Sequence, residues 1–272
     1  MSIMNFTQYI PSLKSQFLKE MGYHLNLENP TTLSEKLNYL KIYDTTDLKT
    51  LCSDKVKVRD YVKDKLNENI SIPLIGIYDS VEQIDFSTLP KRYVIKCNHG
   101  SGMNLVVKDG NYSLDFIKTK LNEWLKKDFI QYHEYHYAFI KKKIIIEEFI
   151  CDENEVLTDY KFWCFNGKPE FMYISDDGSN DPHTDFFDMN FNHLDIAMRD
   201  PNHKVMPNKP KNFEKMKEFS TILSKDFKFV RVDFYEYKEK LYFGELTFYP
   251  NAGYLHYRGK NYDLEFGSKL KL

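Results

Sequence analysis

The stretch VRVDFYEYKEKLYFGELTFYPNAG, residues 230–253, decides how the rest of the chain is interpreted. Both of its arms alternate between two faces, as β-strands do, and the polar segment 236–240 between them is typical of a turn. The first arm places Arg231 and Asp233 on one face, and the second arm carries Glu245. We therefore predict an antiparallel hairpin, on which two carboxylates and a guanidinium converge if the register brings these faces together.

Such a convergence of acids needs a compensating charge. Like charges that face each other across strands are unfavourable by a few tenths to about 1 kcal/mol. A divalent cation or a cationic neighbour would relieve the repulsion between Asp233 and Glu245. A solvated hairpin face with an Arg231–Asp233 pair is the alternative, and it is favoured when the hairpin is considered alone.

Composition predicts a globular protein with a large core. The chain has 272 residues, of which 42% are hydrophobic and 16% aromatic, enough for one large domain or two lobes. The formal net charge of −2 gives no reason to expect electrostatic capture of nucleic acid or of an anionic membrane surface. We expect no nucleic-acid partner, and the sequence gives no indication of the oligomeric state.

The cysteines and the hydropathy pattern favour a cytoplasmic location. Cys52, Cys97, Cys151 and Cys164 form no CxxC pair, which fits free thiols in a reducing compartment better than disulfides or a zinc site. The N-terminal stretch lacks a continuous apolar region typical of export signals, and no later run approaches 18 apolar residues. We expect no membrane-spanning segment.

The order of local patterns predicts an α+β fold with prominent antiparallel sheet. Helices are expected at 34–44 after Ser34, at 54–66 after Ser53, at 114–129 after Ser113, and near 212–224. Strands are expected at 73–80, on both sides of a turn within 89–110, at 141–150, and on both sides of an Asn-Gly turn within 158–175. These elements divide into an N-terminal helical region 1–70, a first lobe 71–150 and a second lobe 151–272.

Four further segments carry candidate binding residues. In YVIKCNHGSG, Lys96 precedes a turn with Gly100 and Gly102, whose small size lets backbone N–H groups approach an anion. Lys55 lies in the first turn of a predicted helix, the strand IIIEEFI (144–150) runs into a linker, and Lys161 alternates with aromatic residues in DYKFWCFNG. Taken singly, each segment also has an ordinary structural reading, such as a turn or a solvated lysine.

Taken together, these segments resemble a known family. The ordered set DK…VIKCNHGSG…IIIEEFI…DYKFWCFNGKP…VRVDF…GELTFYPNAG, spanning roughly 31–270, is similar to the TupA-like branch of the ATP-grasp superfamily, which is associated with teichuronopeptide and other cell-surface polysaccharide biosynthesis. The similarity extends at motif level to D-alanyl-D-alanine ligases. The resemblance implies two α+β lobes whose antiparallel sheets clamp ATP.

The resemblance also implies roles at individual positions. The cations expected to bind phosphate or to stabilise the transferred phosphoryl group are Lys55, Lys96, Lys161 and Arg231. The flap over the phosphates would be formed by His99, Gly100, Ser101 and Gly102. The hinge whose backbone binds adenine would be Glu147, Glu148, Phe149 and Ile150, with Glu153 or Glu155 contacting the ribose. The magnesium ligands would be Asp233 and Glu245, with Thr247 beside them.

Three positions depart from the family pattern. Thr247 stands where superfamily members usually have an asparagine, although a hydroxyl oxygen can still bind Mg²⁺. Cys97 stands where a proline often follows the lysine, and we interpret it as structural. The region before Lys55 is too short for the Rossmann-like domain that precedes the clamp in many relatives, so the acceptor must be recognised differently.

The function implied by the resemblance is ATP-dependent ligation of a carboxylate to an amine through an acyl phosphate, with ATP and Mg²⁺ as cofactors. The carboxylate would belong to a uronic acid or a similar acidic unit of a surface polysaccharide. Three alternatives remain open: a phosphotransferase that uses the same clamp, a nucleotide sensor without catalysis, and a metal-dependent glycosyltransferase that uses Asp176 and Asp177. The acidic pair reads equally well as part of a polar turn.

A few loop residues could face an acceptor. His183, Asp185 and Arg258 lie in segments without strong periodicity. His183 has the ordinary reading of a loop histidine, and Arg258 that of a partner for a nearby acid. The sequence does not identify the two substrates.

Overall fold

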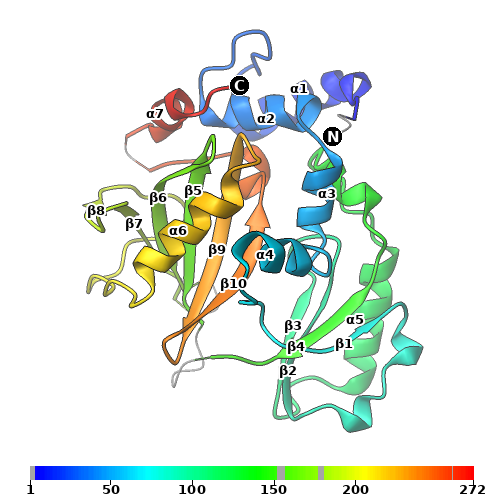
Figure 1. Ribbon diagram of the computed structural model, residues 1–272. Helices are drawn as coiled ribbons and strands as arrows, with labels where there is room; N and C mark the ends of the chain where they lie inside the picture. Colours follow the sequence, from blue (N-terminus) through cyan, green and yellow to red (C-terminus); the bar gives the residue numbers. More distant parts are fainter. Residues whose placement is uncertain (1–3, 152–156, 177–180, 259) are drawn as a thin grey trace.

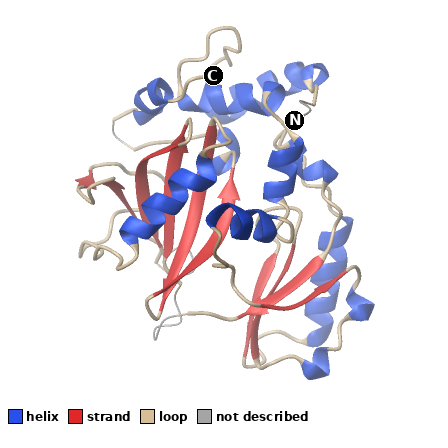
Figure 2. Cartoon of the chain, in the orientation of Figure 1, coloured by secondary structure: helices blue, strands red, loops and turns tan. Residues whose placement is uncertain are grey.

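Two antiparallel sheets form the framework of the protein (Figures 1 and 2). The computed structural model describes residues 4–151, 157–176, 181–258 and 260–272. The larger sheet has six strands in the order β10-β9-β5-β6-β7-β8, and the smaller sheet has four in the order β1-β4-β2-β3. Helices pack against both sheets, so the predicted α+β class is confirmed.

Among the described residues, four α-helices precede the first strand, and the other three lie between strands or after the last one. They are α1 (Ile10–Met21), α2 (Leu33–Tyr43), α3 (Asp47–Ser53), α4 (Val58–Leu66), α5 (Leu114–Lys126), α6 (Phe213–Ser224) and α7 (Tyr262–Lys269). Short 3₁₀ helices are η1 (Thr7–Tyr9), η2 (Val81–Gln83), η3 (Phe86–Thr88), η4 (Tyr135–Phe139) and η5 (Pro250–Gly253).

The strands follow the predicted order, except that the two strands at 184–188 and 193–194 were not predicted, because this segment reads as a polar loop from Asp176 to about Asn192. Those of the smaller sheet are β1 (Leu74–Tyr78), β2 (Arg92–Cys97), β3 (Asn104–Lys108) and β4 (Ile144–Glu148). Those of the larger sheet are β5 (Asp159–Phe165), β6 (Lys168–Ser175), β7 (Thr184–Asp188), β8 (His193–Leu194), β9 (Phe229–Tyr237) and β10 (Lys240–Thr247). The chain therefore passes from one sheet to the other between β4 and β5.

Two helices begin at other residues than predicted, because side chains form hydrogen bonds with backbone N–H groups near their ends. Helix α2 begins after Thr32, not Ser34, because Thr32 and Glu35 form a reciprocal capping box. The helix predicted over 54–66 is interrupted: Ser53 ends α3, and the carboxylate of Asp54 accepts the backbone N–H of Val56 at 2.9 Å. Local bonding of this kind offers the backbone an alternative to the helix. The predicted cap of α5 by Ser113 is present.

Two cores hold the sheets. The smaller sheet packs against α5 through Ile95, Ile117, Leu121, Ile144 and Ile146, all of which are buried. The larger sheet packs against α6 and also against the N-terminal helices, because a single buried cluster joins Leu33, Leu37, Leu40, Val58, Val62, Phe162, Val232 and Phe234. The helices within the N-terminal region 1–70 thus share the core of the larger sheet.

The β9–β10 hairpin contains a bulge that the alternation of the sequence does not reveal. Near the turn, Phe243 pairs with Phe234, and both contribute to the core. Further along, Leu246 pairs with Val232, again in the core. The register therefore shifts by one residue at 244–245. A bulge inserts one extra residue into one strand and re-aims the side chains that follow it.

This shift changes which face Glu245 occupies. Strict alternation would put Glu245 on the core face with Phe243. Because Thr247 pairs with Arg231 beyond the bulge, Glu245 instead faces the same side as Asp233. The two acids converge because of the bulge. The expectation that side chains alternate strictly along the whole second arm is therefore wrong at 244–245.

Two predictions about the chain's environment can be compared with the structure. Cys52, Cys97 and Cys164 are buried thiols outside any disulfide, as their spacing predicts. Within the part of the chain that the structure describes, no helix combines the length and apolar composition needed to cross a bilayer.

Candidate functional site

A cavity of about 580 Å³ lies between the two sheets, and we call it the intersheet cavity. Its size falls in the range of about 300–1,000 Å³ that is typical of small-molecule sites. Residues of both sheets and of the N-terminal helices line it, among them Lys55, Arg59, Lys96, Gly100, Ser101, Gly102, Glu147, Glu148, Phe149, Ile150, Asp159, Lys161, Asp233 and Glu245. Most of the predicted site residues are thus brought together.

The hairpin contributes the acidic end of the site. The guanidinium of Arg231 donates two hydrogen bonds to the carboxylate of Asp233, at 2.8 Å and 2.5 Å. It also contacts Glu245 at 3.3 Å and the hydroxyl of Thr247 at 3.1 Å, and that hydroxyl donates to Glu245 at 3.1 Å. The predicted cluster of two acids and one guanidinium is therefore present, with Thr247 inside it.

The two carboxylates differ in their surroundings. The Asp233 side chain is 2% exposed, whereas that of Glu245 is 43% exposed. Burial raises the pKa of Asp233, although Arg231 opposes the shift. Partial burial also acts to raise the pKa of Glu245. The positive charges of Lys55, Arg231 and Lys161 have the larger effect, so its pKa lies below the usual value. Glu245 is the acid more open to a ligand.

Lys55 is held between the N-terminal helices and the glycine-containing loop. Its ammonium donates to the carbonyl of Gly100 at 2.6 Å, and its backbone N–H donates to the carbonyl of Asn98 at 3.2 Å. The amide of Asn98 donates in turn to the carboxylate of Asp54 at 2.8 Å. Burial lowers the pKa of Lys55, with Glu245 opposing the shift. The Asp54–Asn98 bond therefore ties the loop to the lysine.

The loop after β2 requires its glycines. A Cβ atom at Gly100 would lie 2.7 Å from the ring of Phe129, closer than Cβ atoms approach other heavy atoms in proteins. Gly102 has a φ of +69°, in the left-handed region that favours glycine. Both glycines and Ser101 line the intersheet cavity.

His99 is placed differently from the other predicted flap residues. Its side chain is buried, and its Nε2 atom lies 3.2 Å from the carbonyl oxygens of both Trp124 and Lys127, at the end of α5. It does not line the intersheet cavity. Any contact of His99 with a bound ligand would therefore have to come from its backbone, because the ring is committed to α5.

A second ion-pair cluster organises the face of the smaller sheet. Glu147, on β4, is 4% exposed and pairs with the ammonium of Lys96 at 2.6 Å and with the guanidinium of Arg59 at 3.0 Å. The side chain of Glu147 thus positions Lys96, a role that the sequence did not indicate. Arg59 was not predicted either, because its partner Glu147 lies 88 positions further along the chain.

Lys161 lies on the middle of the larger sheet. On β5 it pairs with Asp233 of β9 on one side and with Tyr173 of β6 on the other. Its ammonium lies 3.8 Å from the carboxylate of Asp159 and 5.5 Å from the centre of the Tyr173 ring. Burial would lower the pKa of Lys161, but Tyr173 and Asp159 raise it above its ordinary value. A fixed positive charge therefore faces the cavity.

The end of the hinge at Ile150 is apolar. Ile150 packs with Ile72 and Tyr242, and Leu157 lies against this group. The backbone N–H of Glu148 donates to the carbonyl of Pro73 at 3.0 Å. The predicted ribose contacts Glu153 and Glu155 lie outside the described residues, as does Asp177.

The loop residues considered for an acceptor lie elsewhere. Asp176, His183, Asp185 and Arg258 do not line the intersheet cavity. The guanidinium of Arg258 instead donates to the carbonyl of Arg199, so its partner is a backbone group, not an acid.

The chemistry of these donors fits two kinds of ligand group. Carboxylate and hydroxyl oxygens from Asp233, Glu245 and Thr247 are the ligands that a hard divalent cation prefers. Lys55, Lys96 and Lys161 are among the lysines that line the cavity, the last two from different sheets, and they provide the positive charge that a polyphosphate requires. In this structure the charge of Arg231 compensates both acids.

Comparisons with known proteins agree with this geometry. The model of the TupA-like ATP-grasp family matches residues 35–271. Among solved structures, the D-alanine–D-alanine ligase of Helicobacter pylori has 19% sequence identity and a TM-score of 0.50, covering 81% of this chain and 62% of its own. The D-alanine–D-alanine ligase of Bacillus anthracis, complexed with ATP, has 16% identity and a TM-score of 0.42, covering 72% and 53%.

The solved structures and the family model support different conclusions. The 19% identity with the Helicobacter pylori ligase, at a TM-score of 0.50, indicates a shared fold only. The chain spans 53% and 62% of the lengths of the Bacillus anthracis and Helicobacter pylori ligases. A comparison with curated proteins gave no match. The family model, however, covers nearly the whole sequence. The chain therefore belongs to the TupA-like ATP-grasp family.

Proposed function

We propose that this protein is an ATP-dependent ligase that joins a carboxylate to an amine. The observation that carries the proposal is the meeting, in one cavity, of Lys96 from the smaller sheet, Lys161 from the larger sheet and the acids Asp233 and Glu245. Cations from both sides and a pair of acids are what a triphosphate and its magnesium ion would need. Membership of the ATP-grasp family supports the same reading.

The parts of ATP have candidate partners along the cavity. Lys55, Lys96 and the loop 100–102 would bind the phosphates, and the apolar hinge with the backbone of 147–150 would bind the adenine. Asp233, Glu245 and Thr247 would hold Mg²⁺, which supplies positive charge to the developing phosphoryl oxygens.

Arg231 would have to exchange partners for this to happen. Its guanidinium occupies both carboxylate oxygens of Asp233. A cation bound between Asp233 and Glu245 would replace that charge, which releases Arg231 to donate to a phosphoryl oxygen. Arg231, Lys96 and Lys161 would then stabilise the transferred group, and losing one such donor costs roughly 2.7–4 kcal/mol in barrier by analogy with oxyanion donors.

The proposed reaction has two steps. First, a substrate carboxylate oxygen attacks the γ-phosphorus, the bond to the β-phosphate oxygen breaks, and an acyl phosphate and ADP form. Second, an amine attacks the acyl carbon, the carbon–oxygen bond to phosphate breaks, and an amide, phosphate and a proton result. The residues of the cavity provide charge stabilisation for the first step.

The substrate and cellular setting form the finer part of the proposal. We infer that the carboxylate belongs to a uronic acid or a similar acidic unit of a cell-surface polysaccharide, and this inference rests on the family association alone. A cytoplasmic location is proposed because buried thiols such as Cys52 and Cys164 are typical of a reducing compartment.

One incubation tests the reaction class. The protein, ATP and Mg²⁺ are mixed with pooled uronic acids and amines, ADP is followed by a coupled assay, and products are examined by mass spectrometry. A ligase forms ADP only with a suitable carboxylate, and gives a product whose mass is the sum of acid and amine less one water. Hydroxylamine added in place of the amine should trap the acyl phosphate as a hydroxamate.

The same incubation separates the other functions. A stable phosphorylated product formed without consumption of amine would support a phosphotransferase. Thermal protection by ATP without ADP formation with any carboxylate would support a sensor. Protection by a UDP-sugar and not by ATP would support a glycosyltransferase, and it would contradict the ligase.

A further inference from the structure

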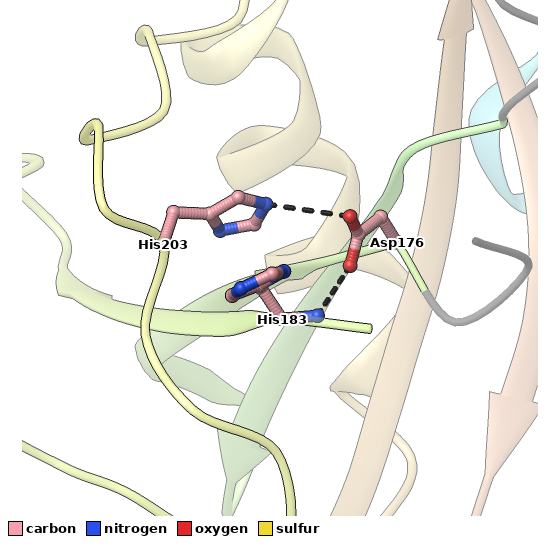
Figure 3. Close-up of side chains that lie close together, drawn as sticks. All are labelled: Asp176, His183 and His203. Carbon is pink, nitrogen blue, oxygen red and sulfur yellow. Dashed lines mark hydrogen bonds and ion pairs between the residues drawn. The ribbon is translucent and has the colours of Figure 1, made fainter. Parts of the chain in front are cut away.

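A cluster of metal-binding side chains lies away from the intersheet cavity, and Figure 3 shows it (Asp176, His183 and His203). Asp176 directly follows β6, His183 directly precedes β7, and His203 lies in the segment between β8 and α6. One potential ligand atom from each residue lies within 4.8 Å of the others. Three segments of the chain therefore meet at this point.

The strand register separates this cluster from the nucleotide site. Asp185, next to the cluster on β7, pairs with Ile174, whereas Lys161 pairs with Tyr173. Neighbouring residues of a strand point to opposite faces. Asp185 therefore lies on the face covered by α6, where Phe162 contacts Phe213, and Lys161 lies on the face of the cavity.

The buried carboxylate of Asp185 orients His203. Asp185 is fully buried, and its carboxylate accepts the ring Nδ1–H of His203 at 2.5 Å and the backbone N–H of the same residue at 3.1 Å. We assign the proton to Nδ1 from this geometry. The lone pair of Nε2 is then directed away from Asp185, toward Asp176. A histidine that binds a metal usually donates its other ring N–H to such an acid.

The spacing of one pair of ligand atoms, on His203 and Asp176, also fits a metal ion. The Nε2 atom of His203 lies 3.5 Å from a carboxylate oxygen of Asp176, longer than an ordinary hydrogen bond. Two ligands that each lie about 2.0–2.1 Å from a tetrahedral zinc ion are about 3.3 Å apart. The other oxygen of Asp176 accepts the backbone N–H of His183 at 2.5 Å, which holds the carboxylate in place.

His183 completes the group. Its ring stacks on that of His203, with the ring centroids 4.7 Å apart (Figure 3). The side chains of His183, His203 and Asp176 are 16%, 25% and 20% exposed. A small ion can therefore reach the cluster from solvent, while most of each side chain is fixed by its neighbours.

We propose that Asp176, His183 and His203 bind a divalent transition-metal ion of the zinc class, with Asp185 as a positioning residue. Two imidazoles and one carboxylate suit zinc and its neighbours in the transition series better than magnesium, which prefers oxygen. Three protein ligands leave a fourth position for water. The bound ion would fasten the segment that carries His203 to the ends of β6 and β7. The proposal does not depend on the ligase activity.

Zinc binding to the intact, untagged protein tests this proposal. After treatment with a chelator, the protein is titrated with Zn²⁺ against a chromophoric competitor, in excess Mg²⁺ so that the carboxylates of the cavity are occupied. We expect one high-affinity zinc ion per chain. Cobalt(II) in its place should give a visible absorption band typical of tetrahedral nitrogen and oxygen ligation.

Variants identify the ligands. His203→Ala and His183→Ala should abolish the tight binding, and Asp185→Asn should weaken it by about 10–100-fold. His193→Ala is the matched control, because His193 contacts Asp185 at 3.3 Å without belonging to the cluster. Glu245→Gln tests the nucleotide site. Both controls should keep the zinc ion.

Two results would overturn the proposal. The first is an absence of tight zinc binding by the wild-type protein, which needs no variant to fold. The second is binding that persists in His203→Ala but disappears in Glu245→Gln, which would place the ion in the intersheet cavity. Circular dichroism and thermal melting of each variant identify any that fail to fold, and the cobalt spectrum of the wild type then decides.

Discussion

Some residues of the site are engaged by other side chains, and others are open to a ligand. Asp233 is nearly buried and fully engaged by Arg231, whereas Glu245 keeps a substantial part of its side chain open. Arg231 therefore has a double role: in this structure it neutralises the acids, and in the proposed complex it would contact phosphate. The two ion pairs of Arg231 explain why two acids can share one sheet face.

The openness of Glu245 leads to a prediction. Glu245→Gln removes one negative charge from the proposed magnesium site, so we expect the rate of ADP formation to fall by roughly 10²–10³-fold, by analogy with loss of a charge-stabilising donor. The thermal protection by ATP should also lose its dependence on Mg²⁺. Glu218→Gln, an exposed residue of α6, is the control and should behave as wild type. Full magnesium dependence in Glu245→Gln would contradict the metal assignment.

A half-buried histidine, His133, predicts how stability depends on pH. Burial lowers the pKa of His133 to about 4, from an ordinary value of 6.5. The unfolded chain then binds a proton between these pH values that the folded protein does not, so the free energy of unfolding should fall as pH decreases from about 6.5 to about 4. His136 acts in the same direction, because burial and two lysines lower its pKa.

Urea unfolding at a series of pH values measures this slope. His133→Asn is the informative variant, because His133 has a φ of +60°, which asparagine tolerates. The variant should show a flatter dependence between pH 4 and 6.5 than the wild type. An unchanged slope would mean that His133 does not carry the effect.

For individual residues, the sequence predicted the site best where a charged residue lies within one of the ordered motifs. Lys55, Lys96, Lys161 and Glu245 all line one cavity, as their order within the motifs predicts. It was less informative where a role depends on a partner far along the chain. The pairing of Arg59 with Glu147 bridges 88 positions, and no local pattern marks it.

Among the elements, the β9–β10 hairpin shows how one irregularity builds a site. Gly244 lies at the bulge, and a Cβ atom there would be 3.0 Å from the carbonyl oxygen of Asp233 and 3.1 Å from the ring of Tyr235. The close approach of the two backbones is what allows Glu245 to turn toward Asp233. The alternating pattern predicted the hairpin but not this shift, because a bulge has no signature in side-chain polarity.

The bulge can be tested directly. Gly244→Ala should destabilise the protein by about 1–3 kcal/mol, as insertion of an extra methyl group into a tight contact does. The loss of MgATP affinity should exceed that seen with an equally destabilising change elsewhere, such as Ile117→Val in α5, where the side chain packs in the other core. Urea unfolding and calorimetric binding measure the two effects. Unimpaired binding in a destabilised Gly244→Ala would separate the bulge from the site.

The loop after β2 is also held by the hydrogen bond between Asn98 and Asp54. Asp54→Ala removes one of the two acceptors of the buried Asn98 amide, the other being the carbonyl of Lys141. We therefore expect a loss of about 1–3 kcal/mol in stability together with weaker nucleotide binding, because the loop that contacts Lys55 is held less firmly. Asp54→Asn keeps an acceptor oxygen and should retain more of both. Asp64→Ala, an exposed acid of α4, serves as the control. Equal nucleotide affinity in all three variants would contradict the positioning role.

At the scale of the whole molecule, the N-terminal helices link the two sheets. Helices α2, α3 and α4 share the core of the larger sheet, yet Lys55, between α3 and α4, donates to the loop of the smaller sheet. Separation of the sheets would therefore break the Lys55–Gly100 bond. Periodicity predicted these helices, but not which sheet they cover, because an apolar stripe fits any complementary face.

The central claim is that both sheets bind one MgATP. Isothermal titration with a non-hydrolysable ATP analogue and Mg²⁺ tests it, using Lys96→Ala for the smaller sheet and Lys161→Ala for the larger, with the exposed Lys91→Ala and Lys225→Ala as controls. The account predicts one binding site per chain. Each cavity variant should lower the affinity about tenfold or more, because a charge-assisted contact contributes about 1.5–3 kcal/mol. The control variants should bind with unchanged affinity. Binding that is absent, or that depends on the lysine of only one sheet, would contradict it.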